Sequence, residues 1–183
     1  MILGIQTLKI VQKANELVDA LGTREPHRIA HALGIEIIPV AFRRQRGAYR
    51  VLLRNRFIFI KNDLDPVLEN IVLLHEIGHD VLHREEAMRA GSFDELDNRK
   101  SHMEYEANVF AAQVSLEDEK ILEYIRCGYE LQQIACAMHT DVNLAALKIN
   151  VLIEQGHCLR RQKYDNGFLR GNREEYCNTE KPH

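Results

Sequence analysis

"NDLDPVLENIVLLHEIGHDVLHREE", residues 62–86, is the stretch on which the organisation of this chain depends. Pro66 stands near a first helical position, three polar residues before it can cap the helix, and nothing breaks the pattern before its end. The stretch therefore predicts one long helix. Gly78 lies inside it, where glycine costs about 1 kcal/mol relative to alanine, so we expect a neighbouring segment to cross closely there.

The segments around this helix predict an α+β fold with a small antiparallel sheet. "IEIIPVA" (35–41) is typical of a strand, and "GAYRVLL" (47–53) and "RFIFIK" (56–61) predict a hairpin with the tight turn "RN". Helical patterns are expected near residues 5–20, 26–33, 102–114, 117–126, 130–138 and 143–155. One domain over residues 1–156 and a polar, poorly ordered tail over 157–183 follow from this pattern.

Composition indicates a folded globular protein. Hydrophobic residues make up 45% and charged residues 28% of the 183 residues, close to the averages for globular chains. The apolar runs are far shorter than the roughly 20 residues that cross a bilayer, so neither a membrane segment nor an export signal is expected. Four widely spaced cysteines favour reduced thiols in the cytoplasm. A net charge of −3 argues against a protein whose main function is to bind nucleic-acid phosphates.

Three histidines stand at intervals of four in "HEIGHDVLH", residues 75–83. Residues four apart on a helix are separated by one turn and about 40°, so His75 and His79 reach a common point. A zinc ion bound by imidazole nitrogens requires such a pair. Glu76 lies about 100° further around the helix, where it is placed to activate a water at the metal. The spacing matches HExxH, in which two histidines hold zinc and the glutamate is the general base of a peptidase.

His83 leaves two other interpretations open. It lies about 12 Å along the axis from His75, too far for both to bind one ion. A His79/His83 pair is geometrically possible, but it would leave Glu76 a full turn from its expected place. Three histidines on a solvated helix face would bind nothing. We favour His75 and His79 as ligands for three reasons: the glutamate after His75, the apolar residues "IVLL" directly before it, and the glycine inside the helix.

A catalytic zinc ion normally has three protein ligands and an open position, so a third ligand is expected downstream. The nearest acidic, helix-compatible segment is "EYEANVFAAQV", residues 104–114. Glu106 borders a mostly apolar face that includes Ala107 and Phe110, and its small residues allow close helix approach. Glu104 is the competitor; it lies about 160° around the helix, so only one of the two carboxylates can point at the metal. The apolar face favours Glu106.

"HEIGHDVLH" followed about twenty residues later by "EYEANVFAAQ" resembles the ImmA/IrrE family of zinc metallopeptidases, whose pattern is HExxH and then E-A-N-x-F-A. The similarity extends more loosely over most of the chain. It implies a zincin core of gluzincin type, with a small twisted sheet on the active helix and Zn²⁺ as cofactor. His75, His79 and Glu106 would be the ligands and Glu76 the base. The implied role is cytoplasmic cleavage of a regulatory protein, usually a helix-turn-helix repressor of a mobile element or stress regulon.

Two further stretches have a structural and a functional interpretation each. The arginine-rich stretch at residues 43–56 favours a solvated sheet face over electrostatic docking of an acidic partner. Residues 129–155 show the pattern of a helix, a turn and a second helix that is typical of a helix-turn-helix. Their second helix offers only Lys148 as a base, so packing within the peptidase fold is favoured over direct nucleic-acid binding.

The sequence thus supports a zinc endopeptidase that cleaves a DNA-binding repressor. In that mechanism Glu76 takes a proton from water and returns it to the leaving amine. The alternative is a non-catalytic DNA- or protein-binding regulator in which zinc is structural. A closed site with four protein ligands would favour this alternative.

Overall fold

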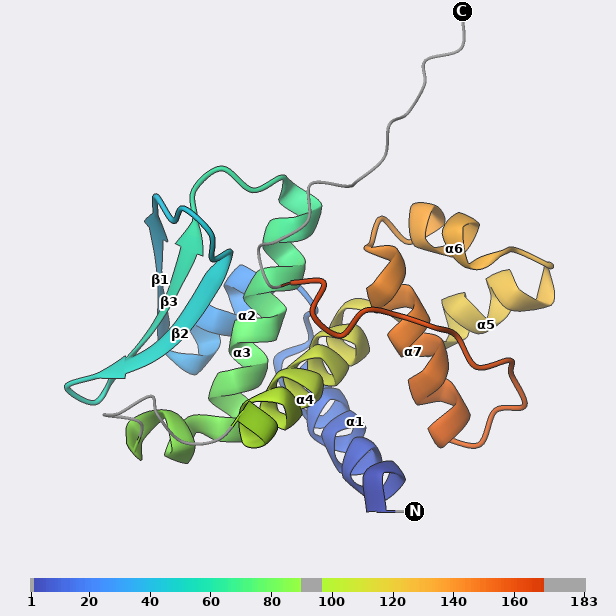
Figure 1. Ribbon diagram of the computed structural model, residues 1–183, viewed down its shortest axis with the longest axis horizontal. Coiled ribbons are helices and arrows are strands. Elements are labelled where there is room, and N and C mark those ends of the chain that lie inside the picture. The colour runs from blue at the N-terminus through green and yellow to red at the C-terminus, as the bar shows by residue number, and fades with distance from the viewer. Residues whose placement is uncertain (1, 90–96, 170–183) are drawn as a thin grey trace, which may run out of the picture.

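The computed structural model describes residues 2–89 and 97–169, which form seven helices and three strands. The elements are α1 (Ile2–Leu21), α2 (Pro26–Leu33), β1 (Ile35–Val40), β2 (Gly47–Leu52), β3 (Asn55–Lys61), α3 (Pro66–Arg89), α4 (Asp97–Ser115), α5 (Asp118–Arg126), α6 (Leu131–Ala137) and α7 (Val142–Glu154). Figure 1 shows the sheet at one end of the molecule, α5 to α7 at the other, and α1, α3 and α4 between them. The expected α+β class is confirmed.

The sheet is mixed, with the strand order β1-β3-β2. β2 and β3 form the expected hairpin, and β1 pairs with β3 in parallel. The sheet is therefore not purely antiparallel, because β3 lies between the two strands that precede it in the sequence. The hairpin turn consists of Leu53 and Arg54, both with positive φ, one residue earlier than expected. β2 is left at an edge of the sheet, and it lies against α3.

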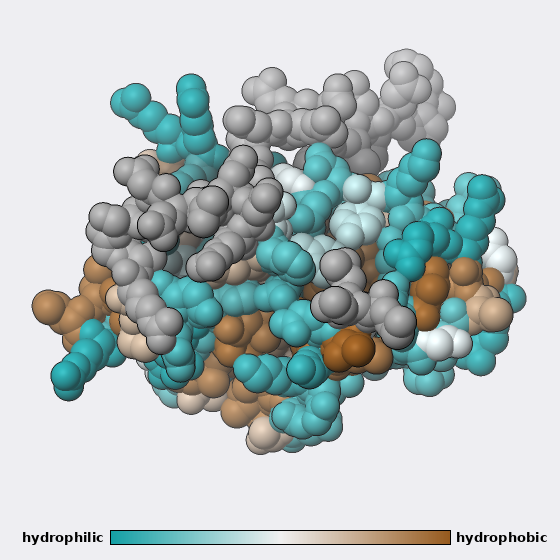
Figure 2. Space-filling model, turned by 60° about the horizontal axis from the view of Figure 1, so that its bottom comes forward, coloured by the Kyte–Doolittle hydropathy of each residue, from teal (hydrophilic) through white to brown (hydrophobic). Residues whose placement is uncertain are grey.

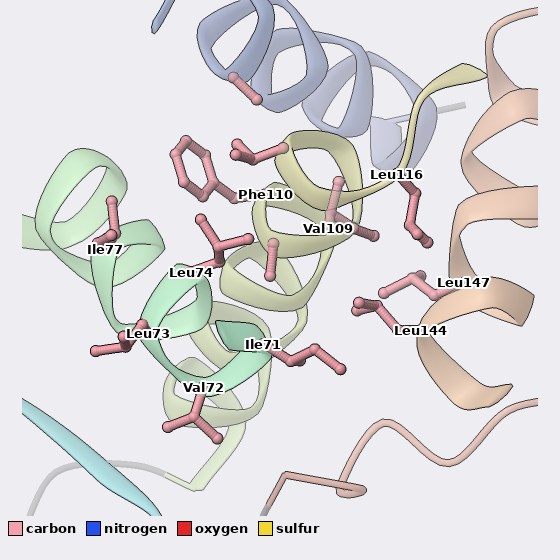
Figure 3. Packing of buried hydrophobic residues seen from close by; sticks show 14 of the residues in the cluster. Ile71, Val72, Leu73, Leu74, Ile77, Val109, Phe110, Leu116, Leu144 and Leu147 are labelled. Carbon is pink, nitrogen blue, oxygen red and sulfur yellow. The ribbon is translucent and has the colours of Figure 1, made fainter. Parts of the chain in front are cut away.

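Helix α3 forms the centre of the protein. Every residue from Ile71 to Gly78 is buried, because β2 covers one side of the helix and α4 another. Figure 3 shows Leu74 of α3 beside Phe110 of α4. Each large apolar side chain buried in this way stabilises the fold by about 1.5–3 kcal/mol. The predicted helix is present, but it does not run unbroken to Glu86: its backbone leaves helical geometry at His83, where φ is −130° and ψ is 23°.

Gly78 lies directly against α4. A Cβ at this position would lie 3.2 Å from the Cα and the carbonyl oxygen of Ala107 and 3.2 Å from Cδ1 of Phe110. The expected close crossing at this glycine is therefore confirmed. Since the backbone of α4 at Ala107 comes this close to α3, the contact fixes how α4 faces α3.

The last two helices belong to the core and not to a separate DNA-reading unit. α7 is buried along its whole middle, from Leu144 to Leu152. Lys148, the basic residue on which DNA reading would depend, is fully buried and donates hydrogen bonds to Gln113 and Asp118. A recognition helix must lie in the major groove, which this burial prevents.

Residues 157–169 follow α7 as an extended segment that packs along the protein, as Figure 1 shows. Phe168 and Leu169 are buried at 7% and 9% exposure and join the main hydrophobic core. The expectation of a poorly ordered tail does not hold for these thirteen residues. The rest of that expected tail, residues 170–183, lies outside the described residues.

The surface shows no single large apolar face in the view of Figure 2, where hydrophobic side chains stand in small groups among hydrophilic ones. No helix in the described part of the chain is long and apolar enough to cross a membrane. Cys127, Cys136 and Cys158 are exposed and form no disulfide, and the fourth cysteine, Cys177, lies outside the described residues.

Candidate metal centre

His75 and His79 of α3 direct their rings to one point. Their Nε2 atoms are 3.1 Å apart and their ring planes stand at 86°. His75 is buried at 5% exposure, and the His79 side chain is 14% exposed. The spacing of four residues therefore produces the convergent pair that was predicted.

The carboxylate that meets this pair belongs to Glu104 of α4. One of its oxygens lies 3.6 Å from Nε2 of His75 and the other 3.6 Å from Nε2 of His79. Ligands at 2.0–2.1 Å from a tetrahedral zinc ion lie about 3.3–3.4 Å from one another, so the three side chains fit such an ion with small adjustments. Within the described residues this is the group whose ligand atoms converge in this way.

The sequence-based choice of Glu106 as third ligand does not agree with this geometry. Glu106 faces the next turn of α3, where its Oε2 lies 3.3 Å from Nε2 of His83 and its Oε1 accepts a hydrogen bond from Gln6. The two glutamates, which are about 160° apart on α4, thus meet successive turns of α3. The contact at Gly78 fixes which of them faces the metal site. His83 therefore belongs with Glu106 and not with the convergent pair.

Asn108 is a residue of this centre that the sequence reasoning missed. Its Oδ1 lies 2.8 Å from Nδ1 of His75, and the side chain is fully buried. A metal-binding histidine usually donates its other ring N–H to an oxygen in this way, which leaves Nε2 free for the metal. The available signal was the spacing: Asn108 follows Glu104 by four residues and so lies on the same face of α4.

Glu76 lies beside the pair but is held by the sheet. Its Oε2 accepts a hydrogen bond of 2.8 Å from the backbone N–H of Tyr49 in β2. Gly47 in the same strand leaves room for it, since a Cβ there would lie 2.9 Å from Oε1 of Glu76 and 2.6 Å from Val72. Burial raises the pKa of Glu76, and a raised pKa makes a carboxylate a better proton acceptor near neutral pH.

The charges of the site favour a cation between the histidines. Burial and then the neighbouring His75 lower the pKa of His79 to about 3, so this imidazole is neutral, the state that binds metals. Burial by itself would lower the pKa of His75, but Glu104 and Glu76 hold it above its ordinary value. The two carboxylates thus stabilise positive charge at this point.

Comparison with known protein families matches residues 30–151 to the IrrE N-terminal-like domain of the M78 peptidases. The chain belongs to this family. The expected resemblance is therefore confirmed, and the family is one of metallopeptidases. The chain is also 29% identical to a protein of Bacillus phage phi105 called "Uncharacterized immunity region protein 2", over 136 residues that cover 72% of this chain and 84% of that protein.

The buried carboxylate of Asp80, next to His79 in α3, links this helix of the M78 domain to β2 and β3. Asp80 is fully buried; it accepts hydrogen bonds from the Tyr49 hydroxyl at 2.6 Å, from Arg56 at 3.1 Å and from Arg84 at 2.7 Å. Arg56 also donates to the carbonyl of Leu33 at the end of α2. A buried carboxylate requires such partners, because an unpaired charge is costly to bury. The cluster fixes β2, and with it the N–H that holds Glu76.

Proposed function

We propose that this protein is a zinc-dependent endopeptidase that cleaves a regulatory protein. The observation that carries the proposal is the convergence of His75, His79 and Glu104 at distances suited to tetrahedral zinc, with the buried carboxylate of Glu76 beside them. Three protein ligands leave a fourth position for water or substrate, the arrangement of catalytic zinc sites. A gluzincin-type zincin core is consistent with two histidines on one helix and a glutamate on another.

Glu76 is the group that would move the proton. A bound zinc ion would supply Lewis-acid polarisation of the scissile carbonyl and would make the attacking water more acidic. Glu76 accepts the proton from that water and returns it to the nitrogen of the leaving amine, so that one C–N bond breaks and one C–O bond forms. The N–H of Tyr49 holds one oxygen of the carboxylate in place during this transfer.

The substrate that we propose is a helix-turn-helix repressor in the cytoplasm. Membership of the M78 family supports a protein substrate, and the similarity to an immunity-region protein of phage phi105 supports a role in the regulation of a mobile element. The burial of Lys148 and α7 supports a protein partner over direct contact with nucleic acid.

The test compares wild type with Glu76→Gln in zinc content and in cleavage of candidate repressors. Glutamine keeps the size of the side chain but cannot accept the proton, so zinc content should stay stoichiometric while the rate of cleavage falls by about 10² to 10⁴. Glu69→Gln, the same change two turns earlier on α3, serves as the matched control and should cleave like wild type. A Glu76→Gln protein that keeps full effect on the repressor, with no fragments from wild type, would instead support the non-catalytic regulator with structural zinc.

A further inference from the structure

The segment of residues 157–169 reaches the metal centre through the side chain of Asn108. Nδ2 of Asn108 donates hydrogen bonds to both the backbone oxygen and the Oδ1 of Asn166, at 3.0 and 3.1 Å. On its other side the amide group of Asn108 faces Nδ1 of His75 at 2.8 Å. Asn166 lies fifteen residues beyond the end of the family match at residue 151.

These contacts determine which way the Asn108 amide is turned. An asparagine side chain carries a donor nitrogen and an acceptor oxygen of similar shape, and only its partners decide between the two orientations. Asn166 offers two acceptors to the same atom, so that atom must be the nitrogen. The oxygen of Asn108 then faces His75 and accepts a proton from Nδ1.

The orientation of the amide in turn selects the tautomer of His75. A neutral imidazole with its proton on Nδ1 has a lone pair on Nε2, the atom directed at His79 and Glu104. A reversed Asn108 amide would donate to Nδ1 and would favour the tautomer with the proton on Nε2, which cannot bind a metal through that atom. The acceptors of Asn166 thus act on the metal site indirectly, through Asn108 and then His75.

We propose that Asn166 is a positioning residue of the metal centre: it orients the amide of Asn108 and thereby holds His75 in the tautomer that binds the ion. The proposal rests on the metal centre of the proposed function, but it does not require proteolysis. It also assigns a role in the site to a segment outside the matched domain.

The segment that carries Asn166 is anchored on both sides of it. Asn150 of α7 exchanges two hydrogen bonds of 2.8 Å with the backbone of Gln162, and Asn143 accepts one of 3.0 Å from the N–H of Asp165. After Asn166, the carbonyl of Phe168 accepts a hydrogen bond of 2.7 Å from Arg46, next to the start of β2. Asn166 is therefore held at the centre by contacts that do not involve the metal ligands.

The decisive experiment is a double-mutant cycle on zinc affinity, measured by competition with a chelator. Asn166→Ala leaves the backbone acceptor in place, so we expect a loss of about tenfold, the lower end of the effect of outer partners on metal affinity. In Asn108→Asp both side-chain oxygens are acceptors, so either orientation of the carboxylate presents an acceptor to Nδ1 of His75. In that background Asn166→Ala should cost nothing, because the only route of its effect has been removed. Arg161→Ala, which removes an exposed ion pair between the same segment and Glu154 without touching Asn108 or Asn166, is the control and should bind zinc like wild type.

A second measurement reads the tautomer directly. In the metal-free protein, at a pH high enough for the His75 ring to be neutral, the ¹⁵N chemical shifts of that ring should show the proton on Nδ1 in wild type and a mixture of tautomers in Asn166→Ala. Asn166→Asp keeps the side-chain acceptor and should restore both the tautomer and the affinity. An equal loss in the Asn108→Asp background, or a loss of the same size in Arg161→Ala, would overturn the proposal. Wild-type protein that binds no zinc would overturn the proposed function itself.

Discussion

Gly78→Ala tests whether the close contact between α3 and α4 sets the geometry of the site. In an open helix this change stabilises by about 1 kcal/mol. Here the new methyl carbon would lie 3.2 Å from the backbone of Ala107 and from Phe110, whereas carbon atoms pack at about 3.5–4.0 Å. The helices must separate by a few tenths of an ångström, and overpacking of a dense core costs about 1–3 kcal/mol. The net expectation is a loss of about 1 kcal/mol in the free energy of unfolding.

Urea unfolding of the metal-free proteins measures this difference. Gly4→Ala in α1 is the matched control: its methyl would meet only the flexible carboxylate of Glu154, so the variant should be as stable as wild type or more stable. Because separation of the helices also moves Glu104 away from the histidines, Gly78→Ala should bind zinc more weakly than wild type. A Gly78→Ala protein that is about 1 kcal/mol more stable, with unchanged zinc affinity, would refute the reasoning.

Three further predictions concern single groups. Glu104→Gln should weaken zinc binding, measured by chelator competition, far more than Glu106→Gln, because only the first removes a carboxylate from the convergent site; equal losses would contradict this assignment. Tyr49→Phe removes the hydroxyl that donates to the buried Asp80 and should lower the free energy of unfolding by about 2 kcal/mol in urea titrations, whereas a neutral effect would show that the two arginines suffice. Burial lowers the pKa of Lys148 from 10.5 to about 8, so between pH 8 and 10.5 the unfolded chain binds more protons than the folded one, and the free energy of unfolding should rise with pH. The urea midpoint of Lys148→Met should not show this rise. An identical pH profile in the variant would count against the buried lysine as its source.

Local patterns in the sequence were sufficient for the elements that carry the site. The helical pattern of residues 62–86 predicted α3 but not its kink at His83. The four-residue spacing predicted the convergence of His75 and His79, and the helical glycine predicted a close neighbour. These predictions succeed because each depends on a repeat within one element. The hairpin was predicted for the same reason, and its turn was displaced by one residue.

The rest of the site depends on contacts between elements. The choice between Glu104 and Glu106 is made by how α4 is rotated against α3, and an apolar border at Ala107 and Phe110 is compatible with either carboxylate. Asn108 could have been inferred from its spacing to Glu104. Asn166 could not, because its partner lies 58 residues away and no periodic pattern relates the two.

The packing of residues 157–169 has a consequence for the synthesis of the protein. A ribosome releases the chain from its N-terminus, and domains generally begin to fold during this release. Helices α3 and α4 therefore emerge long before Phe168 and Leu169, which fill part of the same core. The part of the core that Phe168 and Leu169 fill therefore stays open until these two residues have left the ribosome, so α3 and α4 are synthesised before their packing can be completed.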